Sequence, residues 1–283
     1  MRIIRNASDF QKHMGSFSSA GKRVGFVPTM GYLHEGHLSL IRQSVAENDV
    51  TAASIFVNPA QFAAHEDLST YPRNEQRDLE LLESAGCDIV FIPVPEDIYP
   101  PGFQTYVTVT EITSILEGEF RPEHFRGVTT VVTILLNLSR CNNTYFGRKD
   151  AQQAAVISRM VKDLAIPAAV HVCPIVRETD GLAMSSRNVY LNTEEREEAL
   201  TLFKSLRIAE DLVLQGERDT KVIRSAMTDL YAGLREYELQ YIAFTDAESF
   251  KLIDIVKSGQ PFYILIACRI GKTRLIDNFL LTV

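Results

Sequence analysis

Two histidines lie three residues apart in the segment VPTMGYLHEGH, which ends at His37. His34 and His37 follow a short apolar run, and residues with helical spacing come directly after them. Side chains three apart on a helical turn share a face, and the free amides of a helix N-terminus favour anions. Two imidazoles placed there can donate hydrogen bonds to phosphate oxygens and to charge that develops during a displacement. The motif predicts a phosphate site; the alternative is two ordinary polar residues, one capping the helix and one solvated.

A zinc site is a further interpretation of these histidines, and the sequence does not favour it. Zinc needs at least a third protein ligand, and the other histidines have no spacing that supplies one. The four cysteines are far apart and form no CxxC pair. Each lies in or beside an apolar stretch, so we expect buried free thiols. The remaining histidines are His13, His65, His124 and His171, and the cysteines are Cys87, Cys141, Cys173 and Cys268.

A second segment rich in donors, GLAMSSRN, covers residues 181–188 and follows an expected strand. The hydroxyls of Ser185 and Ser186 and the guanidinium of Arg187 suit a triphosphate, because arginine offers bidentate contact and a fixed charge. Taken alone, the segment is equally typical of a helix-capping loop.

A third segment, YFGRKDAQQ, covers residues 145–153 and again runs from a strand into a helix. Lys149 can act as a point charge on phosphate. Asp150 can accept from ribose hydroxyls or cap the helix that follows. For Lys149 alone, a solvated loop lysine is the alternative.

The elements around these segments alternate between strand and helix. Short apolar runs predict strands, and apolar residues at helical spacing predict the helices between them. The pattern indicates an α/β fold with a Rossmann-like parallel sheet flanked by helices, in which ligands bind beyond the carboxyl ends of the strands. We expect strands over residues 24–28, 50–57, 88–92, 144–147 and 168–173, and helices over residues 36–48, 74–86, 127–141 and 151–164.

After about Val176 the pattern changes to two charged amphipathic helices followed by strands. Thr193 is the expected N-cap of the first helix. We predict helices over residues 193–216 and 219–236, strands over 240–245, 263–267 and 275–280, and a turn within 269–274. The sequence therefore predicts two domains, a Rossmann-like domain over residues 1–175 and a smaller C-terminal α+β domain over residues 176–283.

Composition narrows the function classes. The 283 residues are 46% hydrophobic and 23% charged, with a formal net charge of -7. An acidic chain is a poor candidate for general nucleic-acid binding, which depends on lysine and arginine. The N-terminal stretch has no apolar core typical of a signal peptide, and nothing approaches the length of a membrane span. We expect a cytoplasmic protein with no membrane partner.

The chain resembles a known family over nearly its whole length. The His-x-Gly-His motif is similar to that of nucleotidylyltransferases and class I aminoacyl-tRNA synthetases, and MSSR looks like the loop that partners it there. The resemblance narrows to the pantothenate synthetase family on segments that occur in the expected order between residues 27 and 278. They are PTMGYLHEGH, IFVNPAQF, YPR, HFRGVTTVV, YFGRKDAQQ, DGLAMSSRN and IGKTRLIDN.

The resemblance implies a reaction in two steps. Pantoate carboxylate attacks the α-phosphorus of Mg-ATP and pyrophosphate leaves; the amine of β-alanine then attacks the pantoyl adenylate, giving pantothenate and AMP. Mg²⁺ is expected to bind mainly phosphates and water. The first domain would bind ATP and pantoate, and the chain would form a homodimer. From the position of the domain boundary, we expect the second domain to close over the ATP site as a lid.

The resemblance also implies site residues. ATP would contact Met30, Gly31, Tyr32, Leu33, His34, Glu35, Gly36, His37, Gly147, Arg148, Lys149, Asp150, Val176, Met184, Ser185, Ser186 and Arg187. The catalytic set would be His34, His37, Lys149, Ser185, Ser186 and Arg187, with His37 as proton donor or oxyanion stabiliser. Gln61 and Gln153 would hold pantoate, because amides both donate and accept, and Asn58 would line the same pocket.

Some positions remain open. Asp78 is a candidate for the metal region or a helix-surface carboxylate, and Arg77 beside it competes for the charge. Tyr32, Arg148 and Ala151 depart from the residues expected of the family; Tyr32 narrows the pocket or packs outward. The segment 117–127 is a mobile flap or a surface loop. Two other functions compete, a nucleotidyltransferase that keeps the adenylyl group on its product and a non-catalytic nucleotide-binding module.

Overall fold

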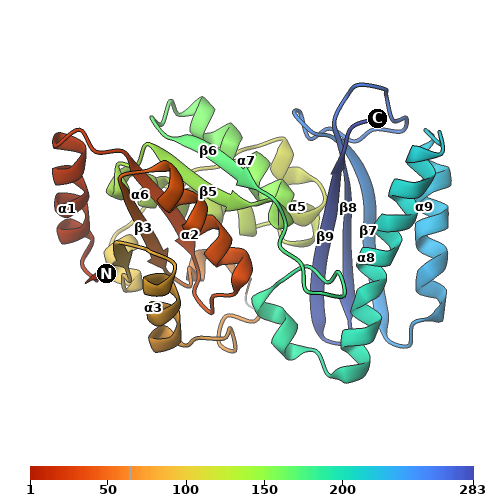
Figure 1. Ribbon diagram of the computed structural model, residues 1–283, viewed down its shortest axis with the longest axis horizontal. Coiled ribbons are helices and arrows are strands. Elements are labelled where there is room, and N and C mark those ends of the chain that lie inside the picture. Colours follow the sequence, from red (N-terminus) through yellow and green to blue (C-terminus); the bar gives the residue numbers. More distant parts are fainter. Residues whose placement is uncertain (64–65) are drawn as a thin grey trace. The chain divides into compact units, whose positions relative to one another are not determined.

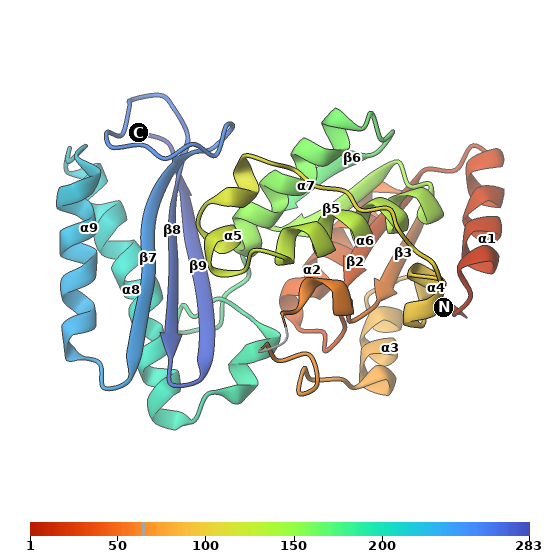
Figure 2. The same ribbon diagram turned by 180° about the vertical axis from the view of Figure 1, so that it is seen from behind.

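The computed structural model describes residues 1–63 and 66–283, so His65 lies outside the described part. The chain folds as two compact units (Figures 1 and 2). The first consists of Met1–Arg148 and Gln152–Pro174, and the second of Lys149–Ala151 and Ile175–Val283. The short segment around Lys149 thus belongs to the second unit although its neighbours on both sides belong to the first.

A parallel sheet of six strands in the order β1-β4-β3-β2-β5-β6 forms the centre of the first unit. This confirms the predicted α/β class with a Rossmann-like sheet. The sequence pattern did not predict β1, because three residues are too few to show a period; β1 pairs with β4 along Arg2↔Ile89 to Ile4↔Phe91. The strands are β1 (Arg2–Ile4), β2 (Val24–Thr29), β3 (Val50–Ile55), β4 (Ile89–Phe91), β5 (Asn143–Gly147) and β6 (Ala169–Cys173).

Helices cover both faces of this sheet. One core lies between the sheet and α1 and α6, where Phe10 and Leu135 are buried; the other lies between the sheet and α2 and α3, where Ile41 and Leu82 are buried. The helix α1 was not predicted, since its residues are largely polar. The helices are α1 (Ala7–Ser19), α2 (Glu35–Glu47), α3 (Glu75–Ser84), α4 (Pro95–Ile98), α5 (Glu117–Phe120), α6 (His124–Ser139) and α7 (Ala151–Asp163).

The strand order reverses between β2 and β5, which makes their carboxyl ends the topological switch point of the sheet. Ligands of open parallel sheets bind in the crevice outside this edge. The HxGH segment follows β2, residues 148–150 follow β5, and Asn58–Gln61 follows β3. The topology therefore places three of the predicted segments along one edge of the sheet.

The second unit is an antiparallel sheet in the order β7-β8-β9, with α8 and α9 against one face (Figure 1). The expected turn within residues 269–274 is confirmed, because β8 ends at Ile270 and β9 begins at Thr273. The elements are α8 (Thr193–Leu214), α9 (Thr220–Asp229), β7 (Tyr237–Asp246), β8 (Phe262–Ile270) and β9 (Thr273–Leu281).

Two details of this unit differ from the prediction. The N-cap of α8 is Asn192 rather than Thr193, because the Asn192 side chain accepts the Glu195 amide and the Glu195 carboxylate accepts the Asn192 amide, both at 2.9 Å. The helix α9 ends at Asp229 and is followed by a 3-10 turn, Leu230–Gly233. Gly233, at the end of this turn, is unfavourable in a helix interior. The helix predicted over residues 219–236 therefore ends earlier.

Candidate active site

The HxGH histidines form a reciprocal cap at the N-terminus of α2. His34 is the N-cap, and its Nδ1 accepts the Gly36 amide at 3.1 Å; Nδ1 of His37 accepts the His34 amide at 3.3 Å. The two rings lie with their centroids 4.1 Å apart. A neutral imidazole that accepts at Nδ1 carries its proton at Nε2. Both histidines therefore cap the helix through one nitrogen and are donors through the other, so capping and anion binding are compatible.

The turn before the helix is held by a buried carboxylate. Tyr32 adopts a left-handed conformation with φ of 50°, which costs energy for a residue with a Cβ. The amides of Tyr32 and Leu33 each donate to one oxygen of Asp78, both at 2.7 Å. Burial raises the pKa of the Asp78 carboxyl, while the two amides and Arg77 oppose that shift. Asp78 is 1% exposed, so the alternative of a solvated helix-surface carboxylate is wrong.

Arg77 closes the other side of this turn. Its Nη1 donates to the Leu33 carbonyl at 2.9 Å, and its guanidinium lies 5.5 Å from the centre of the Tyr32 ring. Gly31 is also left-handed, and a Cβ there would lie 2.9 Å from Ile55 and 3.0 Å from Asp78. Asp78 and Arg77 thus hold the turn before His34 through the amides of Tyr32 and Leu33 and the carbonyl of Leu33.

Gln61, the predicted pantoate residue, is buried next to the same turn. Its Nε2 donates to the Met30 sulfur at 2.9 Å, and its Oε1 accepts from Asn58 at 3.2 Å. The Asn58 side chain also donates to the Gly127 carbonyl at 3.1 Å and accepts from the Tyr99 hydroxyl at 2.8 Å. Asn58 is 1% exposed. We infer that Asn58 orients Gln61, which differs from the predicted role of lining the pocket directly.

Gly127 lets α6 approach the backbone of Gln61, so we expect Gly127→Ala to weaken binding of the ligand that Gln61 holds, which the family resemblance implies is pantoate. A Cβ at this position would lie 2.3 Å from the Ala60 carbonyl oxygen and 2.6 Å from the Gln61 nitrogen. The backbone would have to shift, at a cost of about 1–3 kcal/mol. Steady-state kinetics should show a KM for pantoate raised about tenfold or more, equivalent to ~1.4 kcal/mol. Gly233→Ala, with nothing within 4 Å, is the matched control; an unchanged KM for pantoate in Gly127→Ala would contradict the expectation.

The segment 117–127 is not an irregular surface loop. Glu117–Phe120 forms a helical turn, and Arg121 makes a bidentate ion pair with Glu66, at 2.5 and 2.9 Å. His124 lies between Arg121 and the Gln61 carbonyl, with Nε2 3.2 Å from the first and Nδ1 3.0 Å from the second. Arginine has no acceptor, so the ring is neutral, accepts from Arg121 and donates to Gln61. The segment thus supports the Gln61 backbone.

We expect acid to weaken this support through His124. Burial, reinforced by Arg121 and opposed by Glu66 and Glu117, lowers the pKa of His124 to about 4. The unfolded value is about 6.5, so the unfolded chain binds more protons between these two pH values. Stability therefore falls as the pH drops from about 6.5 to about 4.

His124→Asn keeps a donor for the Gln61 carbonyl and does not titrate. Between about pH 7 and about pH 5 its urea midpoint should fall less than that of the unsubstituted protein. Equal losses in the two proteins would show that His124 does not contribute to the acid sensitivity.

In the second unit, residues 176–188 form a tight hairpin and a 3-10 turn. The Met184 amide donates to the Val176 carbonyl at 3.0 Å, and Arg177 forms an antiparallel bridge with Ala183. Ser185 caps the 3-10 turn Ser186–Tyr190, its hydroxyl accepting the Arg187 amide at 3.2 Å. Ser185 therefore acts as a cap, as the alternative interpretation of this loop expected. This leaves the proposed phosphate contacts of Ser186 and Arg187 possible in the same loop.

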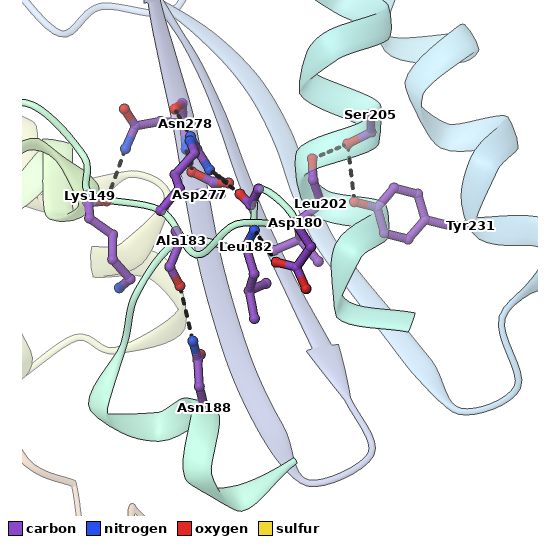
Figure 3. Close-up of polar contacts among 12 residues, drawn as sticks. Lys149, Asp180, Leu182, Ala183, Asn188, Leu202, Ser205, Tyr231, Asp277 and Asn278 are labelled. Atoms are coloured by element: carbon purple, nitrogen blue, oxygen red, sulfur yellow. Dashed lines mark hydrogen bonds and ion pairs between the residues drawn. The ribbon is translucent and has the colours of Figure 1, made fainter. Parts of the chain in front are cut away.

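The turn of this hairpin is tied to α8. Arg196 donates to Glu178 at 2.8 Å and lies 2.8 Å from Asp180. The Asn188 side chain donates to Glu178 at 3.1 Å, and to the Ala183 carbonyl, also at 3.1 Å (Figure 3). These contacts fix both ends of the segment that carries Ser185, Ser186 and Arg187.

The predicted site residues fall into two groups, one in each unit. Lys149 and Asp150 lie in the 3-10 turn Arg148–Asp150, with the Lys149 Nζ 3.8 Å from Asp150 Oδ1. Gln153 lies in the first turn of α7. In the first unit are Met30–His37, Asn58, Gln61, Asp78, Gly147, Arg148 and Gln153, and in the second are Lys149, Asp150, Val176, Met184, Ser185, Ser186 and Arg187.

The described residues contain no group of three His, Cys, Asp or Glu side chains that could hold a metal ion. The expectation for the cysteines is confirmed, because all four are buried and free. Burial raises the pKa of Cys141 and of Cys173 to about 11. In the part of the chain that the structure describes, no helix is long and apolar enough to span a membrane.

Several residues that support the site were missed in the sequence. Gln152 is buried and anchors residues 112–117, since its side chain accepts the Glu117 amide and donates to the Ile112 and Ile115 carbonyls. The acidic residue Asp277 lies within an apolar strand pattern, and a charge in such a pattern is a signal for a buried pair. Gln152 gave no comparable signal, because it is adjacent to Gln153 in an amphipathic helix.

The switch-point sheet and the HxGH cap define an α/β enzyme that binds a nucleotide phosphate. The family model described as pantoate-beta-alanine ligase matches residues 2–280. The chain therefore belongs to the pantoate–β-alanine ligase family, and it catalyses the ATP-dependent condensation of pantoate with β-alanine.

Curated relatives and solved structures agree with this assignment. Pantothenate synthetase from Acetivibrio thermocellus is 49% identical over 100% of both chains, and that from Sulfurihydrogenibium sp. is 50% identical over 98% of this chain and 99% of its own. The crystal structure of pantothenate synthetase from Thermus thermophilus has a TM-score of 0.92 and 40% identity over 99% of both chains. Pantoate-beta-alanine ligase from Francisella tularensis, complexed with beta-gamma ATP and beta-alanine, has a TM-score of 0.81 and 38% identity, covering 99% of this chain and 97% of its own.

Proposed function

We propose that the condensation proceeds through a pantoyl adenylate and that the HxGH cap carries the first step. The single observation behind this proposal is the reciprocal cap, which places two Nε2–H donors at the N-terminus of α2. The carboxylate of pantoate attacks the α-phosphorus, a bond to the bridging oxygen breaks, and pyrophosphate leaves. Donors fixed in advance stabilise the charge that develops on the phosphate oxygens.

The second step needs positioning more than covalent help. The amine of β-alanine attacks the acyl carbon of the adenylate, AMP leaves, and the amine loses a proton to solvent. Gln61 presents an amide that both donates and accepts, which fits the hydroxyl and carboxylate groups of pantoate. Gln153 is proposed to share this role. Asn58, which accepts from the Tyr99 hydroxyl, holds the Gln61 side chain in place.

We propose that Lys149, Ser185, Ser186 and Arg187 complete the ATP site and that the second unit acts as the lid. Lysine supplies a point charge and arginine a bidentate fork for phosphate. Mg²⁺, when bound, neutralises phosphate charge. The described residues offer no cluster of three metal ligands, which supports an ion held mainly by the phosphates of ATP and by water. A homodimer is proposed from the family resemblance, and a cytoplasmic location from the sequence pattern.

The route can be tested with pantoate that carries heavy oxygen in its carboxylate. Protein, Mg-ATP and labelled pantoate should release pyrophosphate without β-alanine, and AMP with one labelled oxygen should accumulate when β-alanine is added. A phosphoryl intermediate would instead label phosphate and release ADP. An enzyme that keeps the adenylyl group on its product would release pyrophosphate but no AMP. Either result would overturn the adenylate route.

A further inference from the structure

Lys149 is attached to the second unit by a buried asparagine on β9. The Nδ2 of Asn278 donates to the Lys149 carbonyl at 2.9 Å (Figure 3), and Asn278 is 1% exposed. This contact lies within the unit that contains Lys149–Ala151 and Ile175–Val283. It holds the backbone of the 3-10 turn from which the Lys149 side chain extends.

The preceding residue on the same strand holds the hairpin that leads to Ser185. Asp277 and Arg177 form a bidentate ion pair at 2.6 and 2.9 Å, and Arg177 also donates to the Gly181 carbonyl at 3.0 Å. The guanidinium lies 4.7 Å from the centre of the Phe203 ring and 5.3 Å from that of Phe279. Charge, hydrogen bonds and ring contacts therefore fix the hairpin on β9.

Successive side chains on a strand point to opposite faces of the sheet. Asp277 shares a face with Phe279 and so points towards the hairpin and Phe203 of α8, while Asn278 points to the other face. The strand is itself rigid, because Asp277 pairs with Ile266 and Asn278 with Leu265 of the central strand β8. Two adjacent residues thus attach two different ATP-binding segments to one strand.

We propose that Asn278 is a positioning residue that holds Lys149 in a fixed place relative to Ser185, Ser186 and Arg187. This inference rests on the proposed roles of Lys149 and of that loop. Without the Asn278 bond, the hairpin remains on β9 through Asp277, but the Lys149 carbonyl loses its hydrogen-bond donor on β9. A misplacement of about 1 Å in a positioned group costs up to about 100-fold in rate.

Asn278→Asp keeps the size of the side chain and replaces the donor with an acceptor that faces the Lys149 carbonyl. Pantoate-dependent exchange of pyrophosphate into ATP isolates the first step. We expect its kcat to fall about 10- to 100-fold, with the KM for pantoate within about twofold. The melting temperature should also fall, because the new carboxylate is buried without a donor, so kcat is measured well below the melting temperature of the variant. The control is Gln240→Ala, which removes the 2.7 Å bond from Arg274 on β9 and should keep the unsubstituted kcat.

A double-mutant cycle separates positioning from a general structural role. If Asn278 acts through Lys149, Lys149→Ala combined with Asn278→Asp should be no slower than Lys149→Ala alone. If the kcat losses of the two single variants multiply in the double variant, the inference is overturned. A normal kcat in Asn278→Asp beside an impaired Lys149→Ala would overturn it while leaving the proposed role of Lys149 intact. A normal kcat in Lys149→Ala would overturn both.

Discussion

His37→Ala is expected to lower kcat for pyrophosphate release by about 10²–10³-fold, the cost of removing one donor to a developing oxyanion. The KM for ATP should change much less, because the donor acts mostly in the transition state. His37 has two roles, however, as a donor to phosphate and as part of the helix cap. Its Nδ1 accepts the His34 amide at 3.3 Å, so alanine also removes part of the α2 cap, worth about 1 kcal/mol.

Two further variants separate these tasks. His37→Asn offers an oxygen near the position of Nδ1 and keeps an acceptor for the His34 amide, but it lacks a donor at Nε2. His37→Gln offers an amide that reaches the Nε2 position, without the capping acceptor. Pre-steady-state release of pyrophosphate should therefore be faster in His37→Gln than in His37→Asn, while the melting temperature should follow the opposite order. Full activity in His37→Asn would mean that His37 only caps the helix.

Asp78→Ala is the substitution with the second largest expected effect. It removes both acceptors from the Tyr32 and Leu33 amides, which lie at 2.7 Å. Hydrogen bonds to a charged group contribute about 1.5–3 kcal/mol each. Tyr32 would no longer be held in its left-handed conformation, and the turn that precedes His34 would relax. We expect about 2–4 kcal/mol lower stability, a KM for ATP raised about tenfold or more and a lower kcat.

Substitutions of Asp78 also show whether this residue anchors the turn or binds the metal. If Asp78 binds Mg²⁺, a higher Mg²⁺ concentration should restore part of the activity of Asp78→Asn. If Asp78 anchors the turn, the Mg²⁺ dependence should match that of the unsubstituted protein while the KM for ATP stays high. Asp88→Asn is the matched control, because Asp88 also accepts a backbone amide, from Thr51 at 2.8 Å, near the amino end of β3. Its kinetics should be unchanged.

Much of the first unit was predictable because local patterns and topology agree there. Apolar runs predicted β2 to β6, and alternation with helices implied that their carboxyl ends share one edge. The strand β1 and helix α1 were missed. A strand of three residues has no period, and it is stabilised by its pairing with β4 rather than by its own sequence.

The sequence alone determined the α/β class, the HxGH turn at a strand end and the membership of the family, because each depends on residue types at fixed local spacing. Only the tertiary structure decided what each side chain contacts. It showed that Asp78 accepts the amides of a turn more than 40 residues away in the chain, and that Asn278 holds the backbone of Lys149. Such contacts join distant segments, and a carboxylate or amide has the same sequence signature whether it binds solvent, a metal or a backbone group. Burial and partners, which exist only in the folded chain, decide among these roles.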